Sequence, residues 1–218
     1  MPGDALVLGT GKASAAMAVA VSEQLSGSVR GLVVTGYGHG LQPTETAGPI
    51  EILEAGHPLP DEASADAGQR LLRLARTIAP TETLLFLASG GGSALSIAPL
   101  GTITLEQKRL VADYLMRNGA DIREINCVRR HLSALKGGRL AAAAHPAHVV
   151  TLAISDVPGD AISDIASGPT IPDPTTTRQA LEILARYEYP HRDELASALT
   201  EPQFESPKPG DPAFASDQ

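Results

Sequence analysis

The sequence has few of the residues that several protein classes depend on. It contains a single cysteine, Cys127, no tryptophan and only 3% aromatic residues. A single cysteine excludes an intrachain disulfide and favours a reducing compartment, and we interpret Cys127 as a buried structural thiol. The shortage of aromatics removes the stacking platforms that bind single-stranded nucleic acid, and a net charge of −8 disfavours contact with phosphate backbones. We therefore expect no nucleic-acid partner.

Long apolar runs are missing as well. No run approaches the roughly 18 residues of a membrane-spanning helix. The first apolar segment begins at Ala5, which leaves no room for a signal peptide. We therefore expect a soluble, cytoplasmic protein without a membrane partner. The 218 residues, 43% of them hydrophobic, are enough to bury a large core.

Strand-like and helix-like segments alternate along the chain. Short apolar segments at 5–8, 31–35, 50–55, 84–88 and 148–154 have the character of buried strands, and helical patterns separate them. This alternation predicts a mostly parallel sheet covered on both faces, a Rossmann-like three-layer α/β/α fold. The last segment, 201–218, holds four prolines without periodicity and is expected to be a linker or an unpaired end.

The stretch LLFLASGGGSAL at 84–95 is the centre of the functional argument. A strand buried on both faces runs into a glycine turn and a helix start. Such turns lie at the carboxyl edge of a parallel sheet, where backbone N–H groups can bind an anion. The alternative interpretation is structural: these glycines would let a helix pack closely on the sheet. The candidate anion-binding residues are Ser89, Gly90, Gly91, Gly92 and Ser93, with the Ser93 hydroxyl hydrogen-bonded to the anion rather than acting as a nucleophile.

A second glycine turn follows the first strand. Gly11 and Lys12 precede a helix start but match neither common phosphate loop, because Leu6 and Ala13 break the Walker pattern. The dinucleotide pattern also fails, since Ser14 replaces Gly or Ala and Thr35 stands where an acidic residue is expected. A lysine at the ligand edge suits a phosphate or carboxylate, although a structural turn with a solvated lysine is an alternative.

Acidic residues follow the strand-like segment at 148–154. Asp156, Asp160 and Asp164 lie four residues apart, with Asp156 at the end of the strand. Carboxylates there can hold Mg²⁺ or accept a proton from a hydroxyl, or they can serve as helix caps. We take Asp156 and Asp160 as candidate metal ligands. His57 lies between Gly56 and Pro58, in a rigid loop after another strand, and is a further candidate.

Basic residues are concentrated in the segment 129–139. Arg129, Arg130 and Lys136 could bind an anionic substrate, and a solvated helix face is the alternative.

Together these motifs resemble one family. The segments are GTGKASAAMA at 9–18, EAGHPLPDEAS at 54–64, LASGGGSAL at 87–95, NCVRRHLSALKGGRLA at 126–141, SDVPGDAISDIASGPT at 155–170 and ESPKPGD at 205–211. They are similar to the N-terminal domain of the bacterial-type glycerate 2-kinases, which carry a C-terminal MOFRL domain. Some members are named hydroxypyruvate reductases.

The resemblance implies ATP and Mg²⁺ as cofactors, D-glycerate as the phosphate acceptor and 2-phosphoglycerate as the expected product. It puts the family's catalytic lysine at Lys12, beside Asp156 as a second catalytic residue. It also implies that residues 1–200 form the N-terminal domain, without the family's usual leading helical segment, and that 201–218 lead toward a MOFRL domain absent from these 218 residues. The family's active site lies between its two domains, so we expect little kinase activity from this chain alone. Assembly as a homodimer is compatible with the resemblance.

Two other functions remain open at this point. One is an NAD(P)H-dependent hydroxypyruvate reductase, which Thr35 disfavours because an acidic residue is expected there. The other is a domain that binds a small anion or nucleotide without turning it over.

Overall fold

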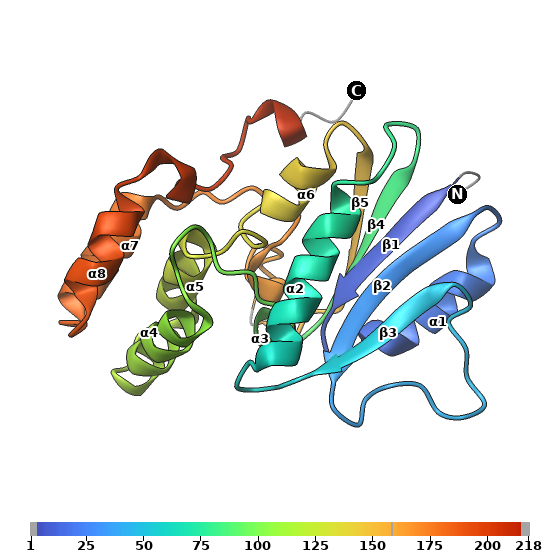
Figure 1. The fold of residues 1–218 in the computed structure, drawn as a ribbon, viewed down its shortest axis with the longest axis horizontal. Coiled ribbons are helices and arrows are strands. Elements are labelled where there is room, and N and C mark those ends of the chain that lie inside the picture. Colours follow the sequence, from blue (N-terminus) through green and yellow to red (C-terminus); the bar gives the residue numbers. More distant parts are fainter. Residues whose placement is uncertain (1–3, 158, 215–218) are drawn as a thin grey trace.

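The structure is a computed structural model that describes residues 4–157 and 159–214. Parallel strands form one sheet in the order β3-β2-β1-β4-β5 (Figure 1). The strands are β1 (Ala5–Thr10), β2 (Val29–Gly36), β3 (Ile50–Ala55), β4 (Thr83–Ala88) and β5 (His148–Ala153). The predicted Rossmann-like α/β fold with a parallel sheet is confirmed.

Helices cover both faces of this sheet. Alternate residues of the central strands point to opposite faces, so Leu8 and Phe86 pack on one side while Val7 and Leu87 pack on the other. The first side is covered by α2 (Glu62–Ala75), α3 (Gly92–Leu95) and α6 (Arg139–Ala144), and the second by α1 (Ser14–Gln24) (Figure 1). The chain therefore forms the three layers that the alternating pattern predicts.

A second group of helices lies beside the sheet. It consists of α4 (Leu105–Arg117), α5 (Ile122–His131), α7 (Thr177–Arg186) and α8 (Arg192–Leu199), which share their own apolar cluster (Figure 1). Thr104, Asp121 and Thr176 each form a capping box at the start of a helix. Among the described residues, no helix has the length and apolar character needed to cross a bilayer.

The register brings the carboxyl ends of the strands to one level. Thr10 pairs with Ala88 and Ala88 with Ala153, while Gly36 pairs with Ala55. The chain runs outward in one direction from β1 to β2 and in the other direction from β4 to β5. The turns after β1 and β4 therefore flank the switch point, where ligands bind in open α/β sheets.

Two expectations fail in this fold. The segment at 148–154 was expected to be buried, but β5 lies at the sheet edge and leaves Leu152 44% exposed. An edge strand in a parallel sheet can have the same apolar sequence as a central one, so composition alone cannot separate them.

The segment after Glu201 is also more ordered than its prolines suggested. It forms η2 (Pro202–Phe204) and η3 (Pro212–Phe214), and Phe204 is fully buried in the apolar cluster of the helices beside the sheet. Arg139 Nη2 donates to the carbonyls of Gln203, Phe204 and Glu205, at 2.9 to 3.1 Å. Residues 201–206 are therefore part of the folded domain, and the expectation of an unpaired end is wrong for them.

Candidate active site

The turns after β1 and β4 are joined backbone to backbone. Lys12 N donates to Gly90 O at 2.9 Å, and the Lys12 carbonyl accepts a hydrogen bond from the Thr35 hydroxyl at 3.1 Å. Both polar groups of the Lys12 backbone are thus fixed. The exposed side chain has no hydrogen bond or ion pair with any described residue. This arrangement leaves the ammonium group available to a ligand.

Three candidate side chains converge on the glycine turn. A Cβ built on Gly91 would lie 3.0 Å from His57 Nε2 and 3.4 Å from Lys12 Cγ, and one built on Gly90 would lie 2.1 Å from Asp156 Oδ2. Gly90 therefore lies directly against the Asp156 carboxylate, and at Gly91 the close approach of His57 and a left-handed φ of 85° both favour glycine. Within the described residues, the N–H groups of Gly90 and Gly91 have no hydrogen-bond acceptor.

Two cavities open at this turn. The larger, the Asp156 cavity, has a volume of about 370 Å³ and is lined by Gly90, Gly91, Asp156, Asn126 and Arg129, among others. The smaller has a volume of about 90 Å³ and is lined by Lys12, Gly36, Tyr37, His39 and His57. Both cavities share His57, so ligand groups in the two can approach the same turn.

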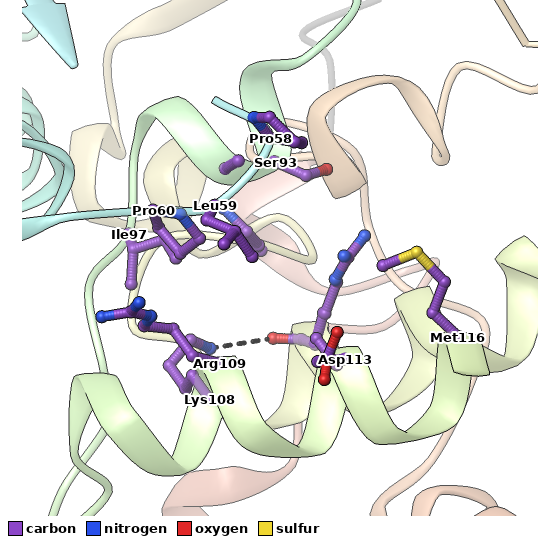
Figure 2. Close-up of a pocket in the computed structure, with 13 residues that line it drawn as sticks. Pro58, Leu59, Pro60, Ser93, Ile97, Lys108, Arg109, Asp113 and Met116 are labelled. Carbon is purple, nitrogen blue, oxygen red and sulfur yellow. Dashed lines mark hydrogen bonds between the residues drawn. The ribbon is translucent and has the colours of Figure 1, made fainter. Parts of the chain in front are cut away.

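A third cavity, the lysine pocket, lies beneath the loop after β3. It has a volume of about 50 Å³, and Figure 2 shows Pro58, Leu59 and Pro60 on one side with Lys108 and Met116 of α4 on the other. Arg129 and Ser93 line both this pocket and the Asp156 cavity. The two cavities are therefore neighbours along one face of the domain.

The lysine pocket is rich in buried positive charge. Lys136 is only 1% exposed and donates to Ser96 O at 2.7 Å, and Lys108 donates to the carbonyls of Arg129 and Leu132. Neither lysine has an ion pair with an acidic side chain among residues 4–157 and 159–214. Burial, followed by the charge of Arg129, lowers the pKa of Lys136 to about 7, and burial lowers the pKa of Lys108 as well.

The pKa values of two groups near the glycine turn are also lowered. Partial burial, and then the neighbouring Lys12 ammonium, lower the pKa of His57, so its imidazole is neutral at pH 7. Burial lowers the pKa of Arg129, whose guanidinium has no hydrogen-bond partner in the described chain. Among the described residues the side chains of Lys12, His57, Asp156 and Arg129 thus have no polar partner, and each lines one of these cavities.

Several predicted site residues do not line any of these three cavities. Ser89 accepts a hydrogen bond from Ala13 N at 3.0 Å, and Gly11 and Gly92 are glycines because Ser89 and Thr10 leave no room for a side chain. Arg130 lies inside the domain, where it pairs with Asp164 at 2.6 Å and with Asp173 at 3.2 Å. Asp160 is exposed and does not line the Asp156 cavity.

Other residues of the site had not been singled out from the sequence. Lys108 lies on the buried side of α4 with Val111 and Leu115, and a lysine within an apolar stripe is the signal that could have indicated it. Asn126 lines the Asp156 cavity and is 1% exposed. Cys127 is buried and its pKa is raised to about 11, mainly by burial, which fits the structural thiol that was expected.

The residues present fit a magnesium ion held partly by substrate. The Asp156 carboxylate has no hydrogen-bond or ion-pair partner among the described residues and lies against Gly90 of the glycine turn. No group of three or more His, Cys, Asp or Glu side chains forms a metal centre in that part of the chain. Mg²⁺ commonly takes one or two protein carboxylates and completes its shell with water and phosphate.

Comparisons with known proteins identify the family of the chain. A family model described as "Domain of unknown function (DUF4147)" matches residues 1–200. A protein from Agrobacterium vitis, provisionally named a hydroxypyruvate reductase, is 50% identical over 212 residues, which are 97% of this chain and 47% of the relative. The D-glycerate 2-kinase of Thermotoga maritima is 43% identical over 204 residues, which are 93% of this chain and 48% of that protein.

A solved structure gives the same result in three dimensions. The crystal structure of glycerate kinase from Thermotoga maritima is similar with a TM-score of 0.86 and 42% identity, over 96% of this chain and 49% of that chain. The chain spans about half the length of the relatives it matches. By sequence and fold, the chain belongs to the DUF4147 family, the N-terminal domain family of the glycerate 2-kinases.

Proposed function

We propose that this domain binds D-glycerate and ATP for phosphoryl transfer to the 2-hydroxyl group of D-glycerate. The observation that carries the proposal is the convergence of Lys12 and Asp156 on Gly90 and Gly91, at the switch point of the sheet; the two side chains and the two glycine N–H groups have no hydrogen-bond partner among the described residues. Phosphoryl transfer depends mainly on positioning and on neutralising phosphate charge, and these groups provide both.

The glycine turn is assigned to the phosphates. The N–H groups of Gly90 and Gly91 donate to phosphate oxygens, and the Lys12 ammonium neutralises their charge. Asp156 would hold Mg²⁺, which would screen the phosphate charge when bound. His57, neutral at pH 7, lies between the two cavities and contacts the transferred group as a hydrogen-bond partner.

Arg129 and the lysine pocket are assigned to the substrate carboxylate. Arg129 lines both this pocket and the Asp156 cavity, so a carboxylate bound there leaves the rest of a three-carbon acid directed toward the glycine turn. Lys136 adds a buried positive charge on the same side. Arg130, paired with two aspartates, maintains the fold instead.

Ligand-induced thermal stabilisation tests this assignment. We expect ATP with Mg²⁺, and separately D-glycerate, to raise the melting temperature of the chain. Lys12→Met should abolish the ATP effect, whereas Arg178→Met, which also removes an exposed cation, should preserve it. A coupled ADP-release assay then measures turnover. If neither ligand stabilises the chain and no ADP is released, the proposal is wrong.

A hydroxypyruvate reductase is the second candidate, because the relative from Agrobacterium vitis carries that provisional name. The structure disfavours it at the end of β2. Thr35 is fully buried there and donates to Lys12 O, so no carboxylate is available for the ribose of a dinucleotide. Loss of NADH or NADPH absorbance in the presence of hydroxypyruvate would favour the reductase.

A further inference from the structure

A line of hydrogen-bonded side chains runs from the candidate site into the interior. Ser93 Oγ, which lines both the Asp156 cavity and the lysine pocket, lies 2.7 Å from Ser167 Oγ. Ser167 Oγ donates to Asn126 Oδ1 at 2.9 Å, and Asn126 Nδ2 donates to Asp164 Oδ1 at 3.0 Å. Ser167 and Asn126 are both buried, so their polar atoms depend on these partners.

The direction of each hydrogen bond can be followed from the interior outward. Arg130 only donates, and its Nη2 lies 2.6 Å from Asp164 Oδ1, so Asp164 is a carboxylate that accepts. Asn126 must then turn its NH₂ toward Asp164 and its oxygen toward Ser167. Ser167 has one hydroxyl proton, which it uses to donate a hydrogen bond to the Asn126 side-chain oxygen. In the short hydrogen bond between the two serines, Ser93 is therefore the donor and Ser167 the acceptor.

This direction leaves Ser93 as an acceptor. Its proton is committed to Ser167, and no described group donates to its oxygen. A ligand in the cavity thus meets lone pairs at Ser93 rather than a hydroxyl donor. The backbone holds the arrangement in place, since Ala166 and Ser167 adopt left-handed φ values of 53° and 59° that non-glycine residues rarely adopt.

We propose that Ser93 is a specificity-determining residue that accepts a hydrogen bond from the 2-hydroxyl group of the substrate. Ser167 and Asn126 are positioning residues that fix the proton of Ser93. D-glycerate satisfies this acceptor with its 2-hydroxyl group, whereas hydroxypyruvate carries a carbonyl oxygen at carbon 2, which is a second acceptor and leaves both oxygens unsatisfied. The inference rests on the proposed function and reverses the sequence-based expectation that the Ser93 hydroxyl donates to an anion.

Calorimetric titration of the chain with D-glycerate and with hydroxypyruvate tests the inference. The unaltered chain should bind D-glycerate at least about tenfold more tightly, the ratio that one mispaired buried hydrogen bond produces. Ser167→Ala frees the proton of Ser93, so we expect hydroxypyruvate to bind more tightly than before and the ratio to fall. Ser93→Ala should weaken D-glycerate binding without improving hydroxypyruvate binding.

Ser22→Ala, a serine whose hydroxyl bonds only within α1, is the matched control and should leave the ratio unchanged. Circular dichroism and melting temperature report whether each variant folds, and the half-buried Ser93→Ala variant provides a test if Ser167→Ala does not fold. An unchanged ratio in folded Ser167→Ala, or in Ser93→Ala, overturns the inference while D-glycerate binding still supports the proposed function. If the unaltered chain binds neither acid, both are wrong.

Discussion

Lys12 and Gly90 are joined by a backbone hydrogen bond of 2.9 Å that links the turns after β1 and β4 across the switch point of the sheet. The bond fixes the backbone from which the Lys12 side chain extends, and it fixes the turn whose glycines Gly90 and Gly91 line the Asp156 cavity. Two turns fixed in this way lower the entropy cost of binding a phosphate, because the ligand does not have to order their backbone.

Gly91→Ala should impair phosphate binding more than it impairs folding. The new Cβ would approach His57 Cδ2 to 2.9 Å at a φ of 85°. We expect a loss of about 1–2 kcal/mol in the free energy of unfolding, the usual cost of a left-handed alanine, and at least about tenfold weaker ATP binding. Gly38→Ala is the control, because its φ is 75° but its Cβ would meet nothing within 4 Å. Equal ATP affinities in the two variants would argue against a phosphate site at the turn.

Substitutions of the neighbouring residues Arg129 and Arg130 should have different effects, one on ligand binding and the other on folding stability. Arg129→Met removes an unpaired guanidinium and should weaken D-glycerate binding at least about tenfold with little change in stability. Arg130→Met leaves Asp164 and Asp173 buried without their cation and should cost about 3–5 kcal/mol in the free energy of unfolding. Urea denaturation and calorimetry distinguish them. Strong destabilisation by Arg129→Met would show that its guanidinium is structural.

The pKa of Lys136 predicts two opposite effects of pH. In the folded chain this pKa is about 7 instead of 10.5, so between those values the unfolded chain binds more protons and stability rises with pH. An anion favours the charged lysine, so D-glycerate affinity should fall as the pH rises above about 7. Melting temperatures and titrations at pH 6.5 and 9 measure both effects. Lys136→Met should flatten both, and an unaltered pH profile in this variant would contradict the assignment.

Phe204→Ala tests whether the segment after Glu201 belongs to the domain. Phe204 is fully buried among the helices beside the sheet, so its truncation should cost about 3–5 kcal/mol in the free energy of unfolding. Phe214→Ala, in the same segment but only half-buried, should cost less. Denaturant titration compares the two. Similar small losses would restore the interpretation of this segment as a linker.

Periodicity and capping residues predicted most of the fold. The strand expected at 50–55 is β3, and Thr104 and Asp121 begin helices where their capping boxes predicted. These signals are local, and the structure preserves them. The position of β5 at the sheet edge and the burial of Phe204 depend on contacts between distant segments, which a local pattern does not contain.

The candidate site was predicted unevenly for the same reason. Lys12, His57 and Asp156 follow strands, and the parallel sheet brings strand ends together, so all three lie beside the glycine turn, while their roles in binding stay predictions. Arg129 and Arg130 are adjacent in sequence and were treated alike. Their positions on α5 differ by about 100° around the helix axis, and so one faces the cavities while the other meets Asp164 and Asp173. Which arginine faces inward follows only from the packing of α5.

Lys108 and Lys136 are buried beside Arg129 without an acidic partner in the described chain. In the free domain this excess positive charge opposes folding, and an anionic ligand supplies the missing counter-ion. If D-glycerate binds there as proposed, it also acts as a structural component that completes the charge balance of the core. Resistance to unfolding should therefore track the concentration of the acid it binds, so that the domain persists longest when its substrate is abundant.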